Sequence, residues 1–328
     1  MRYASVRISP DTSQEALAFA VNDELVAFAD VAASFGGWEN LARAIAHTAG
    51  DVPAENLRSW FSTMLELIEA GPPAWRAAEA AAAAYRRALQ EGRIARAPQR
   101  PGALIAPIPR PRKNIFSVGR NYAAHARERG ADTPEYPMYF TKPPTTVAGP
   151  REAVPYPSVT SAFDYEGELA VVIGRRGRDI PRAKALEYVF GYTIVNDLTA
   201  RDLQARHVQF FKGKSLDGTC PMGPVIVTPD ELRGTWPVTI ETRVNGELRQ
   251  RGSTDQMIFD VPALVAGLSE GMTLEPGDII ATGTPAGVGA ADGRYLKAGD
   301  RIDITISGIG TLTTTISSSG RPPNNEGE

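Results

Sequence analysis

The spacing of apolar residues divides the chain into a first part with helical periodicity and a second part with strand periodicity. In the first part the predicted elements are strands at 3–8 and 25–29 and helices at 39–47, 55–69 and 74–91. The last of these is rich in alanine and poor in β-branched residues, which favours a helix that ends near Gly92. Residues 1–95 are therefore expected to form a small α+β domain.

Residues 96–113 contain five prolines and show little periodicity. Proline restricts both its own backbone and that of the residue before it, so this composition is typical of an extended, stiff connector. We place the domain boundary there, which leaves 114–318 as the main domain and 319–328 as a flexible tail.

The pattern of apolar residues in the main domain predicts short strands separated by turns. Residues 165–173 become continuously apolar, which predicts a strand buried on both faces. Asn245-Gly246 between two strand patterns predicts a hairpin, because both turn positions need a positive φ. Asp260 is expected to cap a helix with Pro262 in its first turn. The fold class is thus α+β, with a closed or rolled mixed sheet rather than a doubly wound one.

Composition narrows the class of protein. Lysine and arginine number 35 against 38 for aspartate and glutamate, a formal charge of −3, so no broad basic surface for nucleic acid is expected. The single cysteine, Cys220, excludes an internal disulfide framework and fits the reducing cytoplasm. Acidic residues interrupt the apolar positions of the first thirty residues, so these are not expected to act as a signal peptide, and no membrane span is expected because no apolar run is long enough.

Glu166, Glu168 and Asp197 are candidate metal ligands. On a strand, positions i and i+2 face the same side, so the two glutamates would lie side by side and repel each other. A hard divalent cation such as Mg²⁺ or Mn²⁺ would relieve that repulsion. The alternative is a solvated strand face for the glutamates and a turn-forming role for Asp197.

His125 and Glu128 are the candidate acid–base pair. Three residues apart, they would share one face of a short helix that Asn121 could cap. A carboxylate orients an imidazole and stabilises its charged form, as a general base requires. The alternative is an exposed helical ion pair.

Two loops complete the set of candidates. The stretch around Lys214 is rich in glycine but lacks the spacing of a phosphate-binding loop, so the lysine is either solvated or balances an anionic ligand. The loop with Thr284 follows an apolar strand and is either a ligand-binding loop or a plain turn. Cys220 is interpreted as structural.

Taken in order, these segments resemble the fumarylacetoacetate hydrolase superfamily, and within it the bacterial oxaloacetate decarboxylases and acylpyruvate hydrolases. The matching stretches span about residues 113–310: GRNYAAHARE, YFTKP, DYEGELAVVIG, GYTIVNDLTARDLQ, KGKSLDGTCPMGP, RVNGELRQ, MIF and GDIIATGTPAGVG. The order of so many segments makes the resemblance specific. Residues 1–113 depart from the N-terminal domain of fumarylacetoacetate hydrolases proper, which supplies a fourth carboxylate to the metal.

The resemblance implies a mixed β-roll, a homodimer and one Mg²⁺ or Mn²⁺ in each site. It implies metal ligation by Glu166, Glu168 and Asp197, and catalysis by His125 and Glu128, carried on a lid segment, together with Lys214. It further implies substrate contacts, which fall on Arg120, Tyr122, Lys142, Gln204 and Thr284.

The expected activity is metal-dependent hydrolysis of a C–C bond in a small 2,4-dioxo acid of the acylpyruvate or fumarylpyruvate type, through a pyruvate enolate. Decarboxylation of oxaloacetate, and isomerisation or hydration of 2-hydroxyhepta-2,4-diene-1,7-dioate-type intermediates of aromatic degradation, need the same enolate chemistry and remain open. A non-catalytic binding protein on the same fold is an alternative of a different class; it predicts loss of a site residue.

Overall fold

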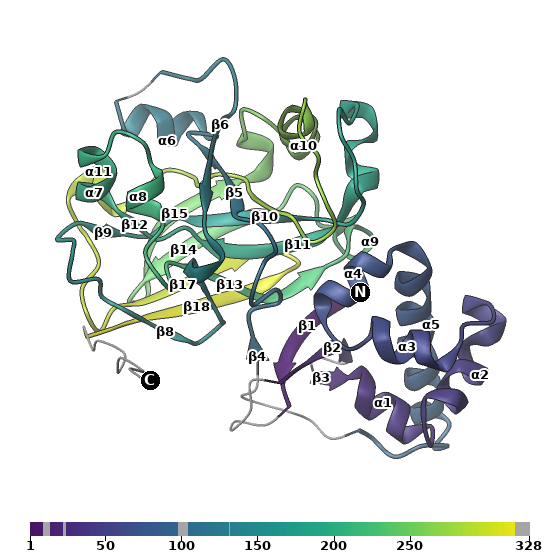
Figure 1. Cartoon of the computed structure of the whole chain (residues 1–328). Coiled ribbons are helices and arrows are strands. Elements are labelled where there is room, and N and C mark those ends of the chain that lie inside the picture. Colours follow the sequence, from purple (N-terminus) through teal and green to yellow (C-terminus); the bar gives the residue numbers. More distant parts are fainter. Residues whose placement is uncertain (9–13, 22–23, 98–103, 131, 319–328) are drawn as a thin grey trace, which may run out of the picture.

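The computed structural model describes residues 1–8, 14–21, 24–97, 104–130 and 132–318 (Figure 1). The expected flexible tail, 319–328, lies outside these residues. Within them the chain forms two large β-sheets, a small two-stranded one, and helices that gather mainly in the N-terminal part.

The largest sheet has eleven strands and forms the centre of the molecule. Along its main path the order is β3 (Glu24–Ala27), β2 (Glu15–Val21), β1 (Arg2–Arg7), β13 (Cys220–Val227), β11 (Val189–Asn196), β10 (Gly167–Ile173), β16 (Ile279–Ala281), β5 (Ile115–Gly119) and β6 (Met138–Lys142). Two short strands pair at its side: β4 (Leu104–Ile105) with β1, and β7 (Val147–Ala148) with β13. Parallel and antiparallel pairs both occur, as the predicted mixed sheet requires.

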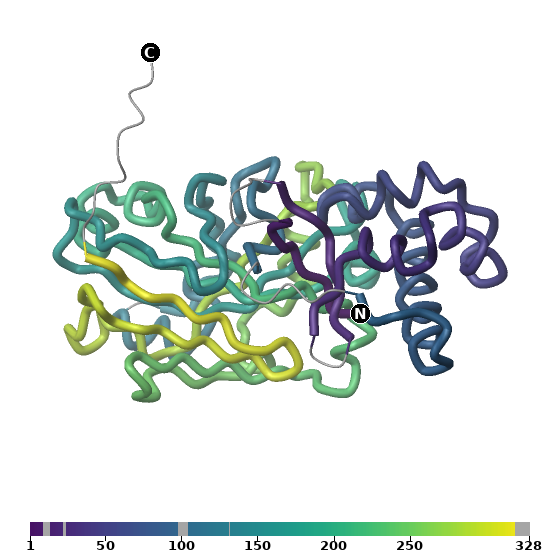
Figure 2. Tube along the Cα trace, turned by 90° about the horizontal axis from the view of Figure 1, so that it is seen from below, coloured from purple at the N-terminus to yellow at the C-terminus, as the bar shows by residue number. Residues whose placement is uncertain are grey.

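A five-stranded sheet packs as a second layer against the central strands (Figure 2). Its order is β15 (Glu247–Ser253), β14 (Thr239–Val244), β17 (Arg301–Ile306), β18 (Gly310–Ser317) and β8 (Ala153–Pro155). The small sheet pairs β9 (Phe163–Asp164) with β12 (Thr199–Ala200). The α+β class with a mixed, rolled sheet is confirmed, although the described strands form open sheets and no closed barrel.

Strand β10 is buried on both faces, as its apolar run predicts. Leu169 and Val171 belong to the core that includes the five-stranded sheet. Ala170 and Val172, on the opposite face, belong to the core that includes the N-terminal helices. The strand that leads from the carboxylate pair is therefore held between two hydrophobic cores.

The N-terminal helices cover that second face of the central sheet: α1 (Phe28–Ser34), α2 (Trp38–Ala49), α3 (Ala54–Trp60), α4 (Met64–Ala70) and α5 (Pro72–Gln90). The single helix expected over 55–69 is two helices, because Thr63 caps α4 by accepting a hydrogen bond from the backbone of Glu66. The alanine-rich segment is the helix α5, and its small side chains lie buried against the neighbouring elements.

The N-terminal segment and the main domain share a sheet and a core. Strand β1 pairs with β13, with Arg2 opposite Val227 and Tyr3 opposite Ile226. The segment expected to be an unpacked connector also differs from expectation, because residues 104–105 pair with β1 and Ile108 is fully buried. Its proline-rich composition does not prevent its apolar side chains from joining the core.

The remaining helices are short and lie on the main domain: α6 (Ala123–Glu128), α7 (Arg201–Arg206), α8 (Phe211–Lys214), α9 (Pro229–Leu232), α10 (Val261–Ser269), α11 (Gly289–Asp292) and the 3₁₀ turns η1 (Pro144–Thr146), η2 (Arg182–Tyr188) and η3 (Thr254–Gln256). Two local predictions are confirmed. Asn245 and Gly246 adopt positive φ in the β14–β15 hairpin, and Asp260 caps α10 by accepting from Ala263 N. Among the described residues, no helix is both long and apolar enough to cross a membrane.

Phe190 of β11 tests how strongly the two parts of the chain depend on each other. Its ring stacks on Tyr3 of β1, with centroids 5.8 Å apart, and meets Trp75 of α5 edge-on at 5.2 Å. Because this buried ring bridges both parts, we expect Phe190→Ala to lower the free energy of unfolding by about 3–5 kcal/mol. The free energy of unfolding is measured by urea titration. Leu248→Ala, at a side chain 39% exposed, is the control, and a loss below about 1 kcal/mol for Phe190→Ala would contradict the shared core.

Candidate active site

Two neighbouring strands bring three carboxylates together. Glu166 directly precedes β10 and Glu168 lies within it, while Asp197 directly follows β11. The two strands are antiparallel, with Gly167 opposite Asn196, so this register sets Glu166 beside Asp197. One oxygen from each of the three carboxylates lies within 4.8 Å of the others, and all three residues are buried. The candidate ligands therefore form one buried acidic cluster rather than a solvated strand face.

Two of these carboxylates are held by buried lysines. Lys214, at the end of α8, donates from Nζ to Glu166 Oε2 at 2.6 Å and to Asp197 Oδ2 at 2.7 Å. Lys142 Nζ lies 2.8 Å from Asp197 Oδ1, a charge contact that does not have the geometry of a hydrogen bond, and this Oδ1 accepts no hydrogen bond from the described residues. Asp197 therefore keeps one buried oxygen whose lone pairs are not engaged by a hydrogen bond.

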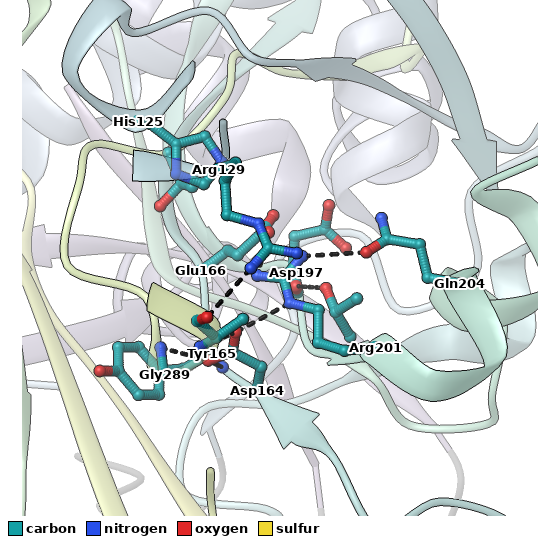
Figure 3. Close-up of polar contacts among 12 residues, drawn as sticks. His125, Arg129, Asp164, Tyr165, Glu166, Asp197, Arg201, Gln204 and Gly289 are labelled. Carbon is teal, nitrogen blue, oxygen red and sulfur yellow. Dashed lines mark hydrogen bonds and ion pairs between the residues drawn. The ribbon is translucent and has the colours of Figure 1, made fainter. Parts of the chain in front are cut away.

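An arginine and a second aspartate extend the network. Arg201 opens α7; its Nη2 lies 2.6 Å from Glu166 Oε1, and its Nε donates to Asp164 Oδ2 at 2.8 Å. Asp164 also accepts from the backbone of Gly289 at 2.7 Å (Figure 3). Glu168 differs from its neighbours: it forms no ion pair within the described ranges and accepts from Gly283 N at 2.8 Å.

The surroundings of the cluster shift the pKa values of Glu166 and Glu168 in opposite directions. Burial alone would raise the pKa of Glu166, but the charges of Lys214 and Arg201 outweigh burial and hold that pKa well below its usual range. For Glu168, burial and the negative charges of Asp197 and Glu166 hold the pKa well above its usual range. Glu168 therefore lacks the counter-charge that its ionised form needs, and a divalent cation would supply it.

His125 and Glu128 form the expected pair on α6. Nδ1 of His125 is hydrogen-bonded to Glu128 Oε1 at 2.8 Å, and Glu128 Oε2 accepts from Gly287 N at 2.9 Å. Because a carboxylate accepts that bond, Nδ1 carries the proton and Nε2 is left for a ligand. Gly287 has φ of 105°, and a Cβ there would collide with the carbonyl oxygen of Arg249. Glycine is thus required at the position that fixes Glu128.

Asn121 acts differently from the expected helix cap. The residue at the cap position of α6 is Tyr122, and no side chain caps the helix. The Asn121 amide instead donates to the carbonyls of Phe259 and Thr282, at 3.0 and 2.8 Å, and accepts from Phe259 N at 2.8 Å. Asn121 therefore ties the residues that lead into α6 to two loops of the main domain.

Glu166 and Glu168 of the acidic cluster line one cavity of about 230 Å³ together with His125, whereas Asp197 is fully buried and does not line it. Seven of the predicted site residues line it: Arg120, His125, Glu166, Glu168, Gln204, Lys214 and Thr284. One wall is aromatic, with Phe140 edge-on to Phe210 at 5.5 Å and the Lys214 ammonium 5.3 Å from the Phe140 ring centre. The cavity therefore combines a charged floor with an apolar wall, as small-molecule sites commonly do.

Gln204 and Thr284 are both held by their neighbours. Gln204 Oε1 accepts from Arg201 Nη1 at 3.2 Å. The Thr284 hydroxyl donates to the carbonyl of Gly167 at 3.0 Å and accepts from Gln250 Nε2 at 2.8 Å. These bonds set the orientation of both side chains before any ligand is bound.

Tyr122 and Lys142, two of the expected substrate contacts, do not line the cavity. The Tyr122 ring is buried, and burial together with the charge of Glu168 raises the pKa of its hydroxyl. Lys142 is fully buried behind Asp197, and its Nζ donates to the carbonyls of Leu198 and Lys214. Both side chains are enclosed in the protein interior, and their contact with a substrate stays a prediction.

Sequence reasoning missed Arg201, Arg129 and the apolar wall. Arg201 lies three residues before Gln204, so the two would share a face of a short helix, and a cluster of buried carboxylates must have cations nearby. These signals could have singled out Arg201. Arg129 lines the cavity from just beyond α6 (Figure 3), and no spacing rule connects it to the acidic cluster.

Fold and site together define an α+β protein with a mixed sheet and a buried carboxylate site whose charges are partly paired with lysine and arginine. The family described as fumarylacetoacetate (FAA) hydrolase C-terminal matches residues 114–317, and the chain belongs to this enzyme family. Oxaloacetate tautomerase YisK of Bacillus subtilis (strain 168) is 59% identical over 218 residues, which cover 65% of this chain and 72% of that protein.

Two solved structures extend the comparison. A fumarylacetoacetate hydrolase from psychrophilic Exiguobacterium antarcticum covers 97% of this chain and 99% of its own, with 37% identity and a TM-score of 0.73. Fumarylpyruvate hydrolase from Pseudomonas aeruginosa, in complex with Mn²⁺ and pyruvate, covers 63% of this chain and 90% of its own, with 37% identity and a TM-score of 0.56. The first similarity includes the N-terminal part as well as the main domain.

The carboxylate cluster fits a divalent cation of the hard, oxygen-binding kind. Its three oxygens are close enough to share one ion, Glu168 has no cationic partner in the part of the chain described, and Asp197 Oδ1 accepts no hydrogen bond there. Mg²⁺ and Mn²⁺ both accept such ligands.

Glu168→Gln tests this fit. The change removes a negative ligand while keeping its shape, so Mn²⁺ affinity measured by calorimetry should fall at least about 10-fold. It also removes a buried carboxyl whose ionised form lacks a counter-charge, so the metal-free variant should melt no lower than the original protein. Glu187→Gln, at an exposed position, is the matched control. Unchanged Mn²⁺ affinity in Glu168→Gln would rule out ligation by this carboxylate.

Proposed function

We propose that this protein enolises a short 2-oxo acid with the help of Mg²⁺ or Mn²⁺, and that it interconverts the keto and enol forms of oxaloacetate. The observation that carries the proposal is the placement of His125, oriented by Glu128, on the same cavity as the acidic cluster and Lys214. The relative that is 59% identical is named for oxaloacetate tautomerisation, which favours this reaction among those that share an enolate.

In this proposal His125 moves the proton. Its Nε2 takes a proton from C3 of the 2-oxo acid and returns a proton to the C2 oxygen, so the enol forms with no net change in charge. Glu128 holds the ring through Nδ1 and stabilises the imidazolium that exists between the two transfers. No water takes part, and no carbon–carbon bond breaks.

Lys214 is the cation for the developing oxyanion. Burial alone would lower the pKa of Lys214. The charges of Asp197 and Glu166 outweigh burial and raise the pKa above its usual value, so the amine stays protonated. An ammonium in a buried site stabilises negative charge more strongly than it would in water. It would therefore lower the cost of removing the C3 proton.

A metal bound by Glu166, Glu168 and Asp197 would supply Lewis-acid polarisation of the 2-oxo group. The formal charges of the buried groups support this: four carboxylates, of Asp164, Glu166, Glu168 and Asp197, face three cations, of Lys142, Arg201 and Lys214. Within this buried network the excess of one negative charge favours a bound cation. A divalent cation reverses that excess, so the loaded site attracts the 2-oxo acid.

The second candidate is hydrolysis of a 2,4-dioxo acid, the reaction favoured by the sequence. It is supported by the similarity to fumarylpyruvate hydrolase. Here His125 would take its proton from water, which attacks C4, and the pyruvate half would leave as the enolate. Decarboxylation and isomerisation remain further alternatives, and the homodimer and cytoplasmic location remain predictions. A non-catalytic protein is disfavoured because each candidate ligand and both members of the His125–Glu128 pair are present.

One assay separates these reactions. The purified protein is incubated with Mg²⁺ or Mn²⁺ and either oxaloacetate or acetylpyruvate, while enol absorbance, pyruvate and CO₂ are followed. Faster loss of the oxaloacetate enol without CO₂ supports tautomerisation. Pyruvate from acetylpyruvate supports hydrolysis, and CO₂ from oxaloacetate supports decarboxylation. If none of these rates exceeds that without protein, the proposal fails.

His125→Gln should lower the rate of enolisation by about 10²–10⁴-fold, because glutamine cannot accept a proton near neutral pH. Mn²⁺ affinity should stay within about threefold, since the carboxylate cluster is unchanged. The control is His47→Gln, at an exposed position of α2, which should behave like the original protein. A His125→Gln variant that retains full activity would exclude this histidine as the base.

A further inference from the structure

The cavity contains more positive charge than its acidic cluster engages. Four lining residues are cationic: Arg120, Arg129, Arg201 and Lys214. Arg201 and Lys214 are each in contact with two carboxylates of the buried network. Arg120 and Arg129 form no ion pair with any described residue, so their charges are available to a ligand.

Arg129 lies directly after α6, the helix that carries His125. Its side chain runs from the end of that helix toward the acidic cluster (Figure 3), and its Nη1 donates to the carbonyl of Ala290 at 3.1 Å. A guanidinium has five N–H donors, so this single bond anchors the group and leaves other N–H groups free to bind a carboxylate.

Arg120 is half-buried at the wall of the same cavity, and its backbone has φ of 56°. Residues other than glycine adopt this left-handed conformation at a cost, and such strain concentrates at functional sites. Its guanidinium has no hydrogen bond or ion pair with the described residues. A strained backbone thus presents an unpaired cation to the cavity.

The rest of the wall offers little to a second carboxylate. Val118, Phe140, Val208 and Phe210 have no side-chain donor, and the Thr284 hydroxyl donates to a backbone carbonyl. The Gln204 amide, whose oxygen accepts from Arg201, is a donor without charge. A ligand whose 2-oxo acid end faces the acidic cluster would therefore find its strongest remaining donors at the two arginines.

We propose that Arg120 and Arg129 bind the distal carboxylate of the substrate and make the site selective for 2-oxo diacids over 2-oxo monoacids. This inference rests on the proposed function only in taking the ligand to be a 2-oxo acid. It does not depend on which bond changes, because tautomerisation and hydrolysis can both act on diacids.

The test compares three ligands that share the 2-oxo acid end or mimic it. Oxaloacetate carries a distal carboxylate, 2-oxobutyrate has a methyl group in its place, and oxalate mimics the reacting end alone. Exchange of the C3 hydrogens for deuterium is followed by NMR, with Mg²⁺ in place of Mn²⁺. After subtraction of the rate without protein, the exchange rates give kcat and KM for oxaloacetate and for 2-oxobutyrate. Inhibition of that exchange gives Ki for oxalate.

Arg129→Gln and Arg120→Gln should each raise KM for oxaloacetate about 10- to 100-fold, because each loses a charged hydrogen-bond donor to the distal carboxylate. The kcat for oxaloacetate, KM for 2-oxobutyrate and Ki for oxalate should stay within about threefold. Arg129→Lys keeps the charge but loses the planar fork, so its KM should be intermediate. Arg127→Gln is the matched control, since Arg127 is exposed on the same helix and does not line this cavity.

Equal weakening of all three ligands would overturn the inference, because it would mean a general effect of charge or of structure on the site. An unchanged KM for oxaloacetate in both variants would overturn it as well. In either case exchange by the original protein would leave the proposed function standing. If the original protein exchanges neither substrate, the proposed function itself fails.

Discussion

Mutual repulsion among three buried carboxylates is the constraint on which the rest of this site depends. Glu166, Glu168 and Asp197 converge because β10 and β11 are paired in one register, and burial strengthens every charge interaction among them. Lys214, Arg201 and Lys142 neutralise part of that charge but leave Glu168 without an ion pair among the described residues. The unbalanced charge makes the cluster a candidate site for a divalent cation and, once that cation is bound, for an anionic substrate.

The surrounding layers make the arrangement rigid. Strand β10 is packed between the core of the five-stranded sheet and the core of the N-terminal helices, so the carboxylates at its start have little freedom to separate. The N-terminal part contributes to this packing through Phe190, which it contacts from both β1 and α5. Residues that are distant from the cavity in the sequence therefore help to hold its charged groups in place. Hydrogen bonds from Asn121, from Gly287 to Glu128 and from Arg129 to Ala290 hold α6 and its flanking residues against the main domain.

Much of the fold could be predicted, because local chemistry and hydrophobic patterning agree with it. The Asn245-Gly246 hairpin, the Asp260 cap and the doubly buried strand all follow from rules that act over a few residues. The predictions that differ from the structure concern long-range packing. A turn at Thr63 divides one expected helix, and residues 104–105 pair with a strand about a hundred residues away in the chain.

The sequence by itself determined the residue types of the acidic cluster, the His125–Glu128 pair and the order of segments typical of the family. Only the tertiary structure decided how those residues are used. It buried Tyr122 and Lys142 away from the cavity, paired Arg201 with Glu166, and brought Arg129 to the cavity wall. The physical reason is that burial and charge pairing are set by the distances between elements, and these distances depend on sheet register and layer packing rather than on spacing along the chain.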